Sequence, residues 1–324
     1  MRRWWPLGLA ILLALLPYGQ AFNAPGTLNL LALCLVFAGL AAGYDLLFGR
    51  TGLLSFGHAL YFAIGAYLTV ILMNHGFALP VAALLAMVAG TVVAALLGAV
   101  ALRVDGIAFS MVTLAFAQVG AIIVARDPGG LTGGEEGATI AKGMPDALVG
   151  VVNTVNLYWL ALAYLVVVLV VLHRVGRSPV GRVLSAIRDD ARRVGVLGLS
   201  PYRYKLMSFV LAGALAALGG TVYVLVVGGA APHLASSDLT LTLLVMVVLG
   251  GPGSRFGPAL GGALFTFLDY QLTDYATDLP GPLAQPMFVL GVVFILAVYF
   301  FPGGLARIGV TLPVWLRRPV RQEG

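Results

Sequence analysis

Long apolar blocks separated by short polar segments dominate the pattern of this chain. A helix that crosses a bilayer needs roughly 20 mostly apolar residues, and enough windows reach that length to predict about ten such helices. The pattern therefore predicts an all-α polytopic membrane protein. The expected spans cover residues 5–21, 27–48, 53–73, 79–101, 107–125, 155–173, 206–228, 238–250, 257–275 and 285–301.

Two of these blocks have an alternative interpretation. The block at 238–250 is short and is followed by Gly250-Gly251-Pro252-Gly253, so residues 238–275 form either two full crossings or a broken element. At the N-terminus, Arg2 and Arg3 precede apolar residues as in a signal peptide. No clear small-x-small cleavage site follows, which favours an uncleaved first span over a cleaved signal peptide.

The distribution of charge predicts the orientation. Only 10% of residues are charged, against about 25% in a typical soluble domain. With ten spans, all of the 19 Lys and Arg residues except Arg126 and Lys142 fall on the side of the N-terminus. Because loops rich in Lys and Arg stay in the cytoplasm, we expect both termini to be cytoplasmic.

Only two connections are long, so we expect residues 1–324 to form a single transmembrane domain. The outward connection, 126–154, is rich in glycine and carries Glu135 and Glu136. The inward connection, 174–205, is strongly basic. We interpret the first either as a solvated loop or as a contact for an external partner.

The inward connection contains an amphipathic pattern. Leu184, Ile187, Ala191 and Val194 recur at helical spacing, and Gly198 is a plausible stop. A helix with this stripe lies either on anionic lipid headgroups or in a groove of a cytoplasmic partner, with the stripe as the anchor. The acidic residues outside the apolar stripe favour the interpretation as a partner contact, because a carboxylate is not attracted to an anionic lipid surface. The off-stripe positions include Arg188, Asp189 and Asp190.

Small residues are abundant, with 42 glycines in the chain. Glycines four residues apart, such as Gly39 and Gly43, favour close helix packing in a membrane. The single cysteine, Cys34, forms no intrachain disulfide and does not make a metal site by itself. We therefore interpret Cys34 as a packing residue and expect no metal site.

Several classes of function lack their sequence signals. The chain has no G-x-x-x-x-G-K-[ST] phosphate loop, no H-E-x-x-H and no G-x-S-x-G. We expect no catalytic residue, no ATP site and no cofactor in this chain. An ion-coupled secondary transporter usually has charged residues at mid-span, and the central thirds of these spans hold almost none.

Three stretches together resemble the branched-chain amino acid permeases of ABC importers, in particular the LivM-type subunit. The first is Thr51–Ala59 with Ile64–Tyr67, the second is Gly181–Asp190 with Leu197-Gly198, and the third is Leu249–Ser254 with Gly257-Pro258. Met111–Gln118 and Leu131–Gly134 fit the same family, so that the resemblance covers most of residues 25–305.

The resemblance implies a division of labour. Such a permease domain forms half of a pathway for branched-chain amino acids in the bacterial inner membrane, with urea or short amides as alternative solutes. The implied partners are a second, LivH-like permease subunit, two ABC ATPase subunits and a periplasmic solute-binding protein, besides membrane lipid. No nucleic acid is expected. The inward connection would hold the ATPase-coupling helix, and Glu135 and Glu136 would contact the binding protein.

Polar residues within apolar spans are the candidates for the pathway. They are Ser55, His58, Thr113 and Gln118. A polar group in a bilayer faces either a cavity or another helix. For Ser55 and Thr113 an interhelical hydrogen bond is the favoured interpretation, whereas for His58 and Gln118 both remain open. Asp269, late in its span, either serves the pathway or reaches outer water.

Overall fold

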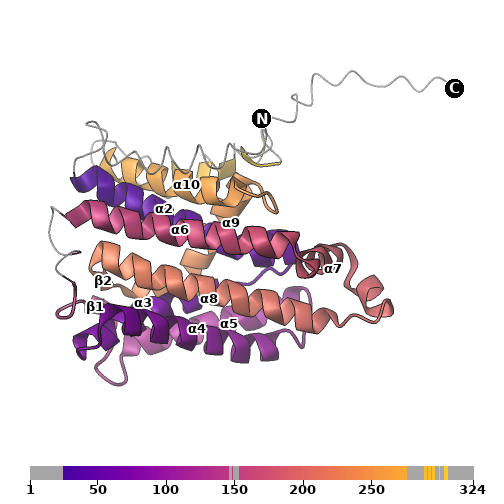
Figure 1. Ribbon diagram of the computed structural model, residues 1–324, viewed down its shortest axis with the longest axis horizontal. Helices are drawn as coiled ribbons and strands as arrows, with labels where there is room; N and C mark the ends of the chain where they lie inside the picture. The colour runs from indigo at the N-terminus through magenta and orange to yellow at the C-terminus, as the bar shows by residue number, and fades with distance from the viewer. Residues whose placement is uncertain are drawn as a thin grey trace, which may run out of the picture.

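The structure is a computed structural model, and it describes residues 25–145, 148, 153–275, 288, 289, 291, 292, 294, 295, 299 and 303–305. The expected first span, 5–21, lies outside the described residues, and most of the expected last span, 285–301, does too. The expected spans between them are all present as helices (Figure 1). Their bounds are α2 Pro25–Asp45, α3 His58–Asn74, α4 Leu79–Ala101, α5 Ile107–Arg126, α6 Thr154–Arg177, α8 Pro201–Val227, α9 Ser237–Gly250 and α10 Gly257–Tyr275.

Shorter elements connect these helices. One turn of π-helix, η2 (Leu46–Thr51), extends α2, and α7 (Pro179–Val196) joins α6 to α8. The 3₁₀ turns η3 (Gly134–Glu136) and η6 (Pro232–Ala235) lie beside a two-residue antiparallel pairing of β1 (Ala138–Thr139) with β2 (Gly229–Ala230). We call the end that holds α7 the basic end and the end that holds β1 and β2 the loop end (Figure 1).

The described residues include five helices that are long and apolar enough to cross a membrane, namely α2 with η2, α4, α5, α6 and α8. The apolar helices α3 and α9 are shorter. The most enclosed helix is α2, in which 83% of the apolar window is buried, whereas only 28% of the window of α4 is buried. The fold is therefore that of an all-α membrane protein with α2 near its centre and α4 at its margin.

The margin is apolar, as lipid requires. The buried face of α4 consists of small residues at a spacing of about four, and its exposed face consists of larger aliphatic ones. Small side chains allow the backbones of α4 and α8 to approach closely. The buried residues are Ala82, Ala86, Gly90, Ala94 and Gly98, and the exposed ones include Leu84, Val88, Val92 and Leu96.

The expected span 53–73 is wrong in its first part, because residues 52–57 are not helical and α3 begins only at His58. The π-turn ends at Gly52 in the left-handed conformation, with φ 76°. The short block at 238–250 forms one helix of 14 residues, and the chain then turns at Gly251 and Gly253, both with positive φ. The expected break thus falls between α9 and α10.

Candidate functional site

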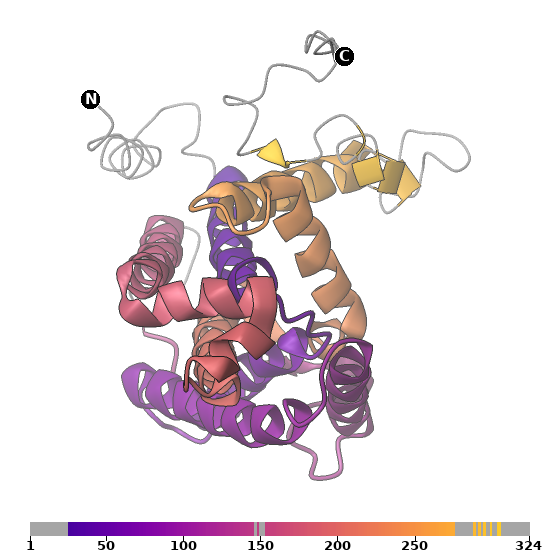
Figure 2. The ribbon, with the colours of Figure 1, turned by 90° about the vertical axis from the view of Figure 1, so that its right-hand side faces the viewer.

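The helix α7 lies across the basic end of the bundle, between the ends of α6 and α8 (Figure 2). Ser178 caps its start, since its Oγ accepts a hydrogen bond from the Gly181 amide at 3.2 Å and Pro179 occupies the first turn. The predicted amphipathic helix is thus present. It occupies residues 179–196 of the inward connection, whose remaining ends belong largely to α6 and α8.

The apolar stripe of α7 faces its own chain. Leu184, Ile187 and Val194 are only 1%, 4% and 4% exposed, and Ala191 is half-buried. The expectation that this stripe anchors the helix in a partner's groove is therefore wrong. The amphipathic period shows which face is apolar, but not whether the permease itself or a partner covers that face.

A kink at Asp190 divides α7. Asp190 has φ −160° and ψ 102°, and its Oδ1 accepts hydrogen bonds from the amides of Arg193 at 3.2 Å and Arg192 at 2.9 Å. Asp190 thus acts as an N-cap in mid-helix, and the Arg193 amide above all lowers the pKa of its carboxyl. The kink sets the direction of the last turn of α7.

Beyond this kink lies an apolar pair that the sequence pattern missed. Val196 is 87% exposed and Leu197 is 78% exposed. They lie between Gly195 and Gly198, where an added side chain would meet no atom of the described residues within 4 Å. Two exposed aliphatic side chains at a strongly charged end are unusual unless a partner covers them. The sequence feature that could have identified this pair is an isolated Val-Leu dipeptide between two glycines in a basic segment.

Arg188 joins α7 to the transmembrane helices. Its guanidinium donates a hydrogen bond to the carbonyl oxygen of Gly49 in η2 and lies over Gly253 in the α9–α10 turn, where a Cβ would come within 3.1 Å of Nη1. A Cβ added at Gly52 would lie 3.2 Å from the Cγ of Arg188. Gly52 and Gly253 thus leave the space that the Arg188 side chain occupies, whereas a Cβ at Gly49 would meet Asp45 and the Gly253 amide.

Asp45 completes this junction from the end of α2. Its Oδ1 accepts a hydrogen bond from the Gly253 amide at 2.7 Å, and its Oδ2 lies 3.8 Å from Arg50 Nε. Its side chain is only 2% exposed. One carboxylate therefore connects the α9–α10 turn to α2, just beside the point that Arg188 reaches from α7. We call Asp45, Gly49, Arg188 and Gly253 the α7 junction.

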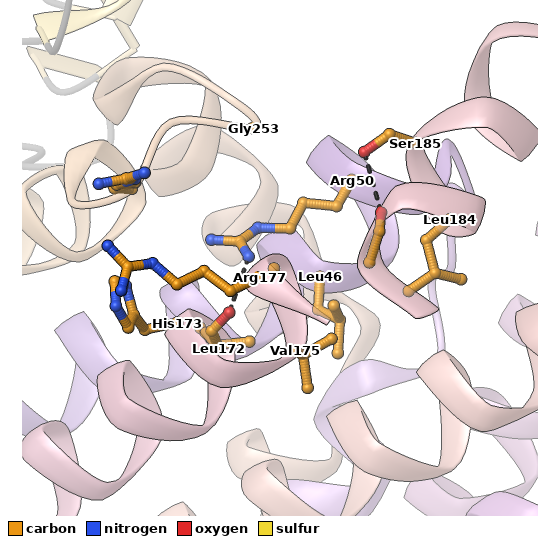
Figure 3. A pocket seen from close by; sticks show the side chains of 12 residues that line it. Leu46, Arg50, Leu172, His173, Val175, Arg177, Leu184, Ser185 and Gly253 are labelled. Carbon is orange, nitrogen blue, oxygen red and sulfur yellow. Dashed lines mark hydrogen bonds between the residues drawn. The ribbon is translucent and has the colours of Figure 1, made fainter. Parts of the chain in front are cut away.

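A cavity of about 210 Å³ lies next to the α7 junction, between α6, α7, η2 and the α9–α10 turn (Figure 3). Arg50 crosses it and donates from Nη1 to the carbonyl oxygen of Leu172 at 2.9 Å. His173 and Arg177 of α6 and Arg255 of the α9–α10 turn also line it. The cavity is strongly cationic.

Two of the four pathway candidates support the non-helical segment 52–57. Thr113 Oγ1 accepts a hydrogen bond from the Phe56 amide at 3.0 Å, and Ser55 Oγ accepts one from the Gly57 amide at 3.3 Å. Both side chains are buried. Non-helical backbone inside a membrane bundle needs such partners. Thr113 joins α5 to the segment 52–57, whereas the Ser55 bond is local and not the interhelical bond expected from the sequence.

The other two candidates differ from each other. Gln118 is exposed, and its Nε2 donates to Ser237 Oγ of α9 at 3.1 Å. His58 is fully buried at the start of α3, with its ring centroid 5.1 Å from that of Tyr44. Neither ring nitrogen of His58 has a hydrogen-bond partner within the described part of the chain. Within the described part of the chain, neither His58 nor Gln118 lines the cavity beside α7 or the cavity between α2, α9 and α10.

At the loop end, Glu135 and Glu136 are both exposed on η3. Asp127 orders the backbone segment that precedes them. Its Oδ1 accepts from the amides of Leu131 at 2.7 Å and Thr132 at 2.8 Å, and its Oδ2 accepts from the Gly133 amide at 3.0 Å. These bonds, above all the one from Thr132, lower the pKa of Asp127. The 126–154 connection therefore begins as an ordered turn.

This turn is expected to open at acid pH. Because the pKa of Asp127 is lower in the folded chain, the carboxylate stabilises the turn fully above its ordinary pKa of about 3.9 and loses this effect as the pH falls through the lower folded value. Asp127→Ala should give the open turn at neutral pH. Hydrogen exchange at the Leu131 and Thr132 amides measures both effects. Exchange as slow in Asp127→Ala as in the unsubstituted chain would contradict this role, and Asp105→Ala at the basic end is the matched control.

A second cavity, of about 750 Å³, lies between α2, α9, α10 and η6. Its walls are mostly apolar, with Leu33 and Phe37 from α2 and Phe265 from α10, and they also carry the carboxylates Asp238 and Asp269. Asp269 thus lines a cavity rather than facing only lipid. A cavity with apolar walls and a few polar groups is typical of sites for small amphiphilic molecules.

Comparisons with known proteins agree with this architecture. Residues 26–298 match the family of branched-chain amino acid transport system permease components. The high-affinity branched-chain amino acid transport system permease protein LivM of Escherichia coli (strain K12) is 31% identical over 309 residues, which cover 86% of this chain and 70% of the relative. No solved structure matches the chain.

Other relatives extend the comparison. LivM of Salmonella typhimurium is 30% identical over 86% of this chain and 70% of the relative. The autoinducer 2 import system permease protein LsrC of an Enterobacter species is 29% identical over 78% of this chain and 71% of the relative. The family match covers most of the chain, including the α7 junction and both cavities. This chain therefore belongs to the branched-chain amino acid transport permease family, whose members are transport components rather than catalytic enzymes.

Proposed function

We propose that this chain is the LivM-type permease subunit of an ATP-driven ABC importer for branched-chain amino acids. The match of residues 26–298 to the permease family carries this proposal, and the LivM relatives supply the class of solute. The chain forms half of the membrane pathway, and a second permease subunit forms the other half. ATP hydrolysis takes place on two separate ATPase subunits.

The proposed topology has ten spans with both termini in the cytoplasm of a bacterium, and the protein lies in the inner membrane. The concentration of Arg and Lys at one end of the described helices supports this orientation. The basic end with α7 then faces the ATPase. The loop end, with Glu135 and Glu136 exposed on η3, faces the solute-binding protein outside.

The helix α7 is the proposed coupling helix, but its exposed parts rather than its apolar stripe contact the ATPase. Leu184, Ile187 and Val194 fasten α7 to the permease. Val196 and Leu197 project beyond the kink, ready to enter an apolar groove of the ATPase. Exposed Arg182, Asp189 and Arg192 precede them on the same helix and supply the polar part of the proposed contact, since interfaces commonly have a polar rim.

The α7 junction is the proposed transmission point. When the ATPase subunits move α7, Arg188 carries that movement to Gly49 at the end of α2 and to Gly253 between α9 and α10. Asp45 keeps these two segments together. Because α2 and α10 pack along one another and line the second cavity, a shift at the junction changes the walls of that cavity.

Arg188→Gln is expected to uncouple transport from ATP hydrolysis. The variant loses the charged contact to Gly49 but keeps the exposed surface of α7, so the ATPase should still bind. A charge-assisted hydrogen bond contributes about 1.5–3 kcal/mol, and transport should fall by about tenfold or more. Uptake and ATP hydrolysis are measured together in proteoliposomes, and together they give the amount of solute transported per ATP hydrolysed. Arg103→Gln, at an exposed position in the α4–α5 connection at the same end, is the matched control, and an equal loss of both activities in Arg188→Gln would contradict the transmission role.

The second cavity is the proposed outer part of the solute route. Leu33, Phe37 and Phe265 suit an aliphatic side chain, and Asp269 suits an α-ammonium group. His58 and Gln118 are proposed pathway residues further along, since both His58 ring nitrogens lack partners in the described part of the chain. Ser55 and Thr113 hold the segment beside His58 in place.

Uptake of radiolabelled leucine tests the proposed function. Cells without this gene should lose leucine uptake, and the gene should restore it only together with intact ATPase subunits. Loss of urea or amide uptake alone would keep the architecture and change the solute. Uptake that follows an ion gradient and continues without ATP would contradict the ABC mechanism in favour of a secondary transporter.

A further inference from the structure

Among the described residues, those that line the cationic cavity beside the α7 junction supply no counter-charge. Arg50, His173, Arg177 and Arg255 line it, and none of its lining residues is acidic. The neighbouring carboxylate of Asp45 is already bonded to the Gly253 amide, and Arg50 reaches it only at 3.8 Å. Three guanidinium groups around one small space repel each other unless an anion lies between them.

The cavity is built rather than accidental. The Arg50 side chain is only 17% exposed, and its hydrogen bond to the Leu172 carbonyl fixes the guanidinium over the last turn of α6. Gly176 makes room for it, since a Cβ there would lie 2.7 Å from Arg50 Nη1. Figure 3 shows Arg50 extending toward the side chains of His173 and Arg177.

The exposed face of α6 leads from lipid into this cavity. Val166, Val170, His173 and Arg177 follow each other at spacings of four, three and four residues, so they form one stripe of the helix. The two valines are 42% and 47% exposed. The stripe is therefore apolar along the bilayer and turns cationic at the basic end, at the depth where headgroups begin.

We propose that this cavity binds a phosphate group, supplied by an anionic phospholipid of the surrounding leaflet. The planar guanidinium groups of Arg177 and Arg255 match phosphate oxygens, and basic pockets between helices at the cytoplasmic side of a membrane suit lipid headgroups. The acyl chain lies along Val166 and Val170. Free inorganic phosphate shares the headgroup chemistry but gains nothing from this apolar stripe.

The bound headgroup would hold together the structural elements that are proposed to move when the ATPase shifts α7. The cavity is walled by η2, the end of α6, the start of α7 and the α9–α10 turn. An anion between Arg50, Arg177 and Arg255 fastens η2, α6 and the α9–α10 turn together, and the start of α7 forms the remaining wall. The lipid site does not depend on which solute the importer carries, so its test and the uptake test fail independently.

Lipid retention by the purified importer tests the proposal. The protein is reconstituted into nanodiscs of phosphatidylcholine with phosphatidylglycerol, extracted, and its retained lipid is counted by native mass spectrometry. Arg177→Gln with Arg255→Gln should reduce retained phosphatidylglycerol by about tenfold or more, since each basic residue contributes about 1 kcal/mol at an anionic surface. Arg192→Gln with Arg203→Gln is the matched control, because it removes the same charge at the same end from residues that do not line the cavity.

Thermal stability in lipid-free detergent identifies the source of the phosphate. Added phosphatidylglycerol should raise the melting temperature of the unsubstituted protein and of the control pair, but not of the cavity pair. Equal lipid retention by the cavity pair and the control pair would overturn the site. Stabilisation by inorganic phosphate without any effect of phosphatidylglycerol would overturn the lipid as its ligand.

Discussion

Val196→Asp combined with Leu197→Asp is expected to remove the ATPase subunits from the purified permease while the permease itself stays folded. Both side chains are largely exposed, so the substitutions leave the packing of the chain intact. Apolar anchors at the centre of an interface typically contribute about 2 kcal/mol each when they are removed. Two such losses, together with the cost of desolvating two carboxylates, should lower the affinity of the permease for the ATPase by about a hundredfold or more.

Copurification of the ATPase with a tagged permease measures this loss. Leu131→Asp is the control, since Leu131 is 52% exposed at the loop end, far from the proposed ATPase contact. The alanine pair, Val196→Ala with Leu197→Ala, should give an intermediate result because it removes apolar area without adding charge. Full copurification of the ATPase with the aspartate pair would refute the tip of α7 as its anchor.

Leu184→Asp combined with Ile187→Asp, unlike the pair at Val196 and Leu197, should destabilise the permease itself. These side chains are 1% and 4% exposed against the chain's own helices, so each substitution buries an unpaired carboxylate. Such a group is among the few single changes that reach about 4 kcal/mol or more. We expect α7 to detach from the bundle, with a lower melting temperature and protease cleavage within residues 179–196.

The neighbouring variant Ala186→Asp separates packing from charge. Ala186 is exposed on the same turn of α7 and does not line the cationic cavity, so the variant adds a carboxylate without burying it. Its melting temperature should stay close to that of the unsubstituted protein. If the buried pair lost only ATPase binding and kept its stability, the stripe would be a partner contact after all.

Much of the fold could be predicted from the sequence. The long apolar blocks located the described transmembrane helices, because a helix in lipid must satisfy its own backbone and stay apolar over its whole length. The period of Leu184, Ile187 and Val194 located α7 and its apolar face. Gly39 and Gly43 in α2 indicated close packing, and a Cβ at Gly39 would meet the Tyr164 ring of α6.

Other features depend on contacts between distant parts of the chain. The span expected from residue 53 begins only at His58, because side chains of other helices, such as Thr113 in α5, satisfy the backbone of residues 52–57. Hydropathy cannot detect such a break, since the residues within it are still apolar. For the same reason Ser55 looked like a residue inside a helix.

The sequence by itself determined which segments are apolar enough to cross a membrane and that the inward connection forms an amphipathic helix, because the first follows from hydropathy and the second from local periodicity. Only the tertiary structure decided what covers that helix and which charges meet beneath it. Asp45 and Gly253 lie 208 positions apart, and Arg188 reaches Gly49 across 139 positions. Periodicity fixes the face of a helix, whereas the packing of the whole bundle fixes its neighbour. The α7 junction and the cationic cavity therefore appear only in three dimensions.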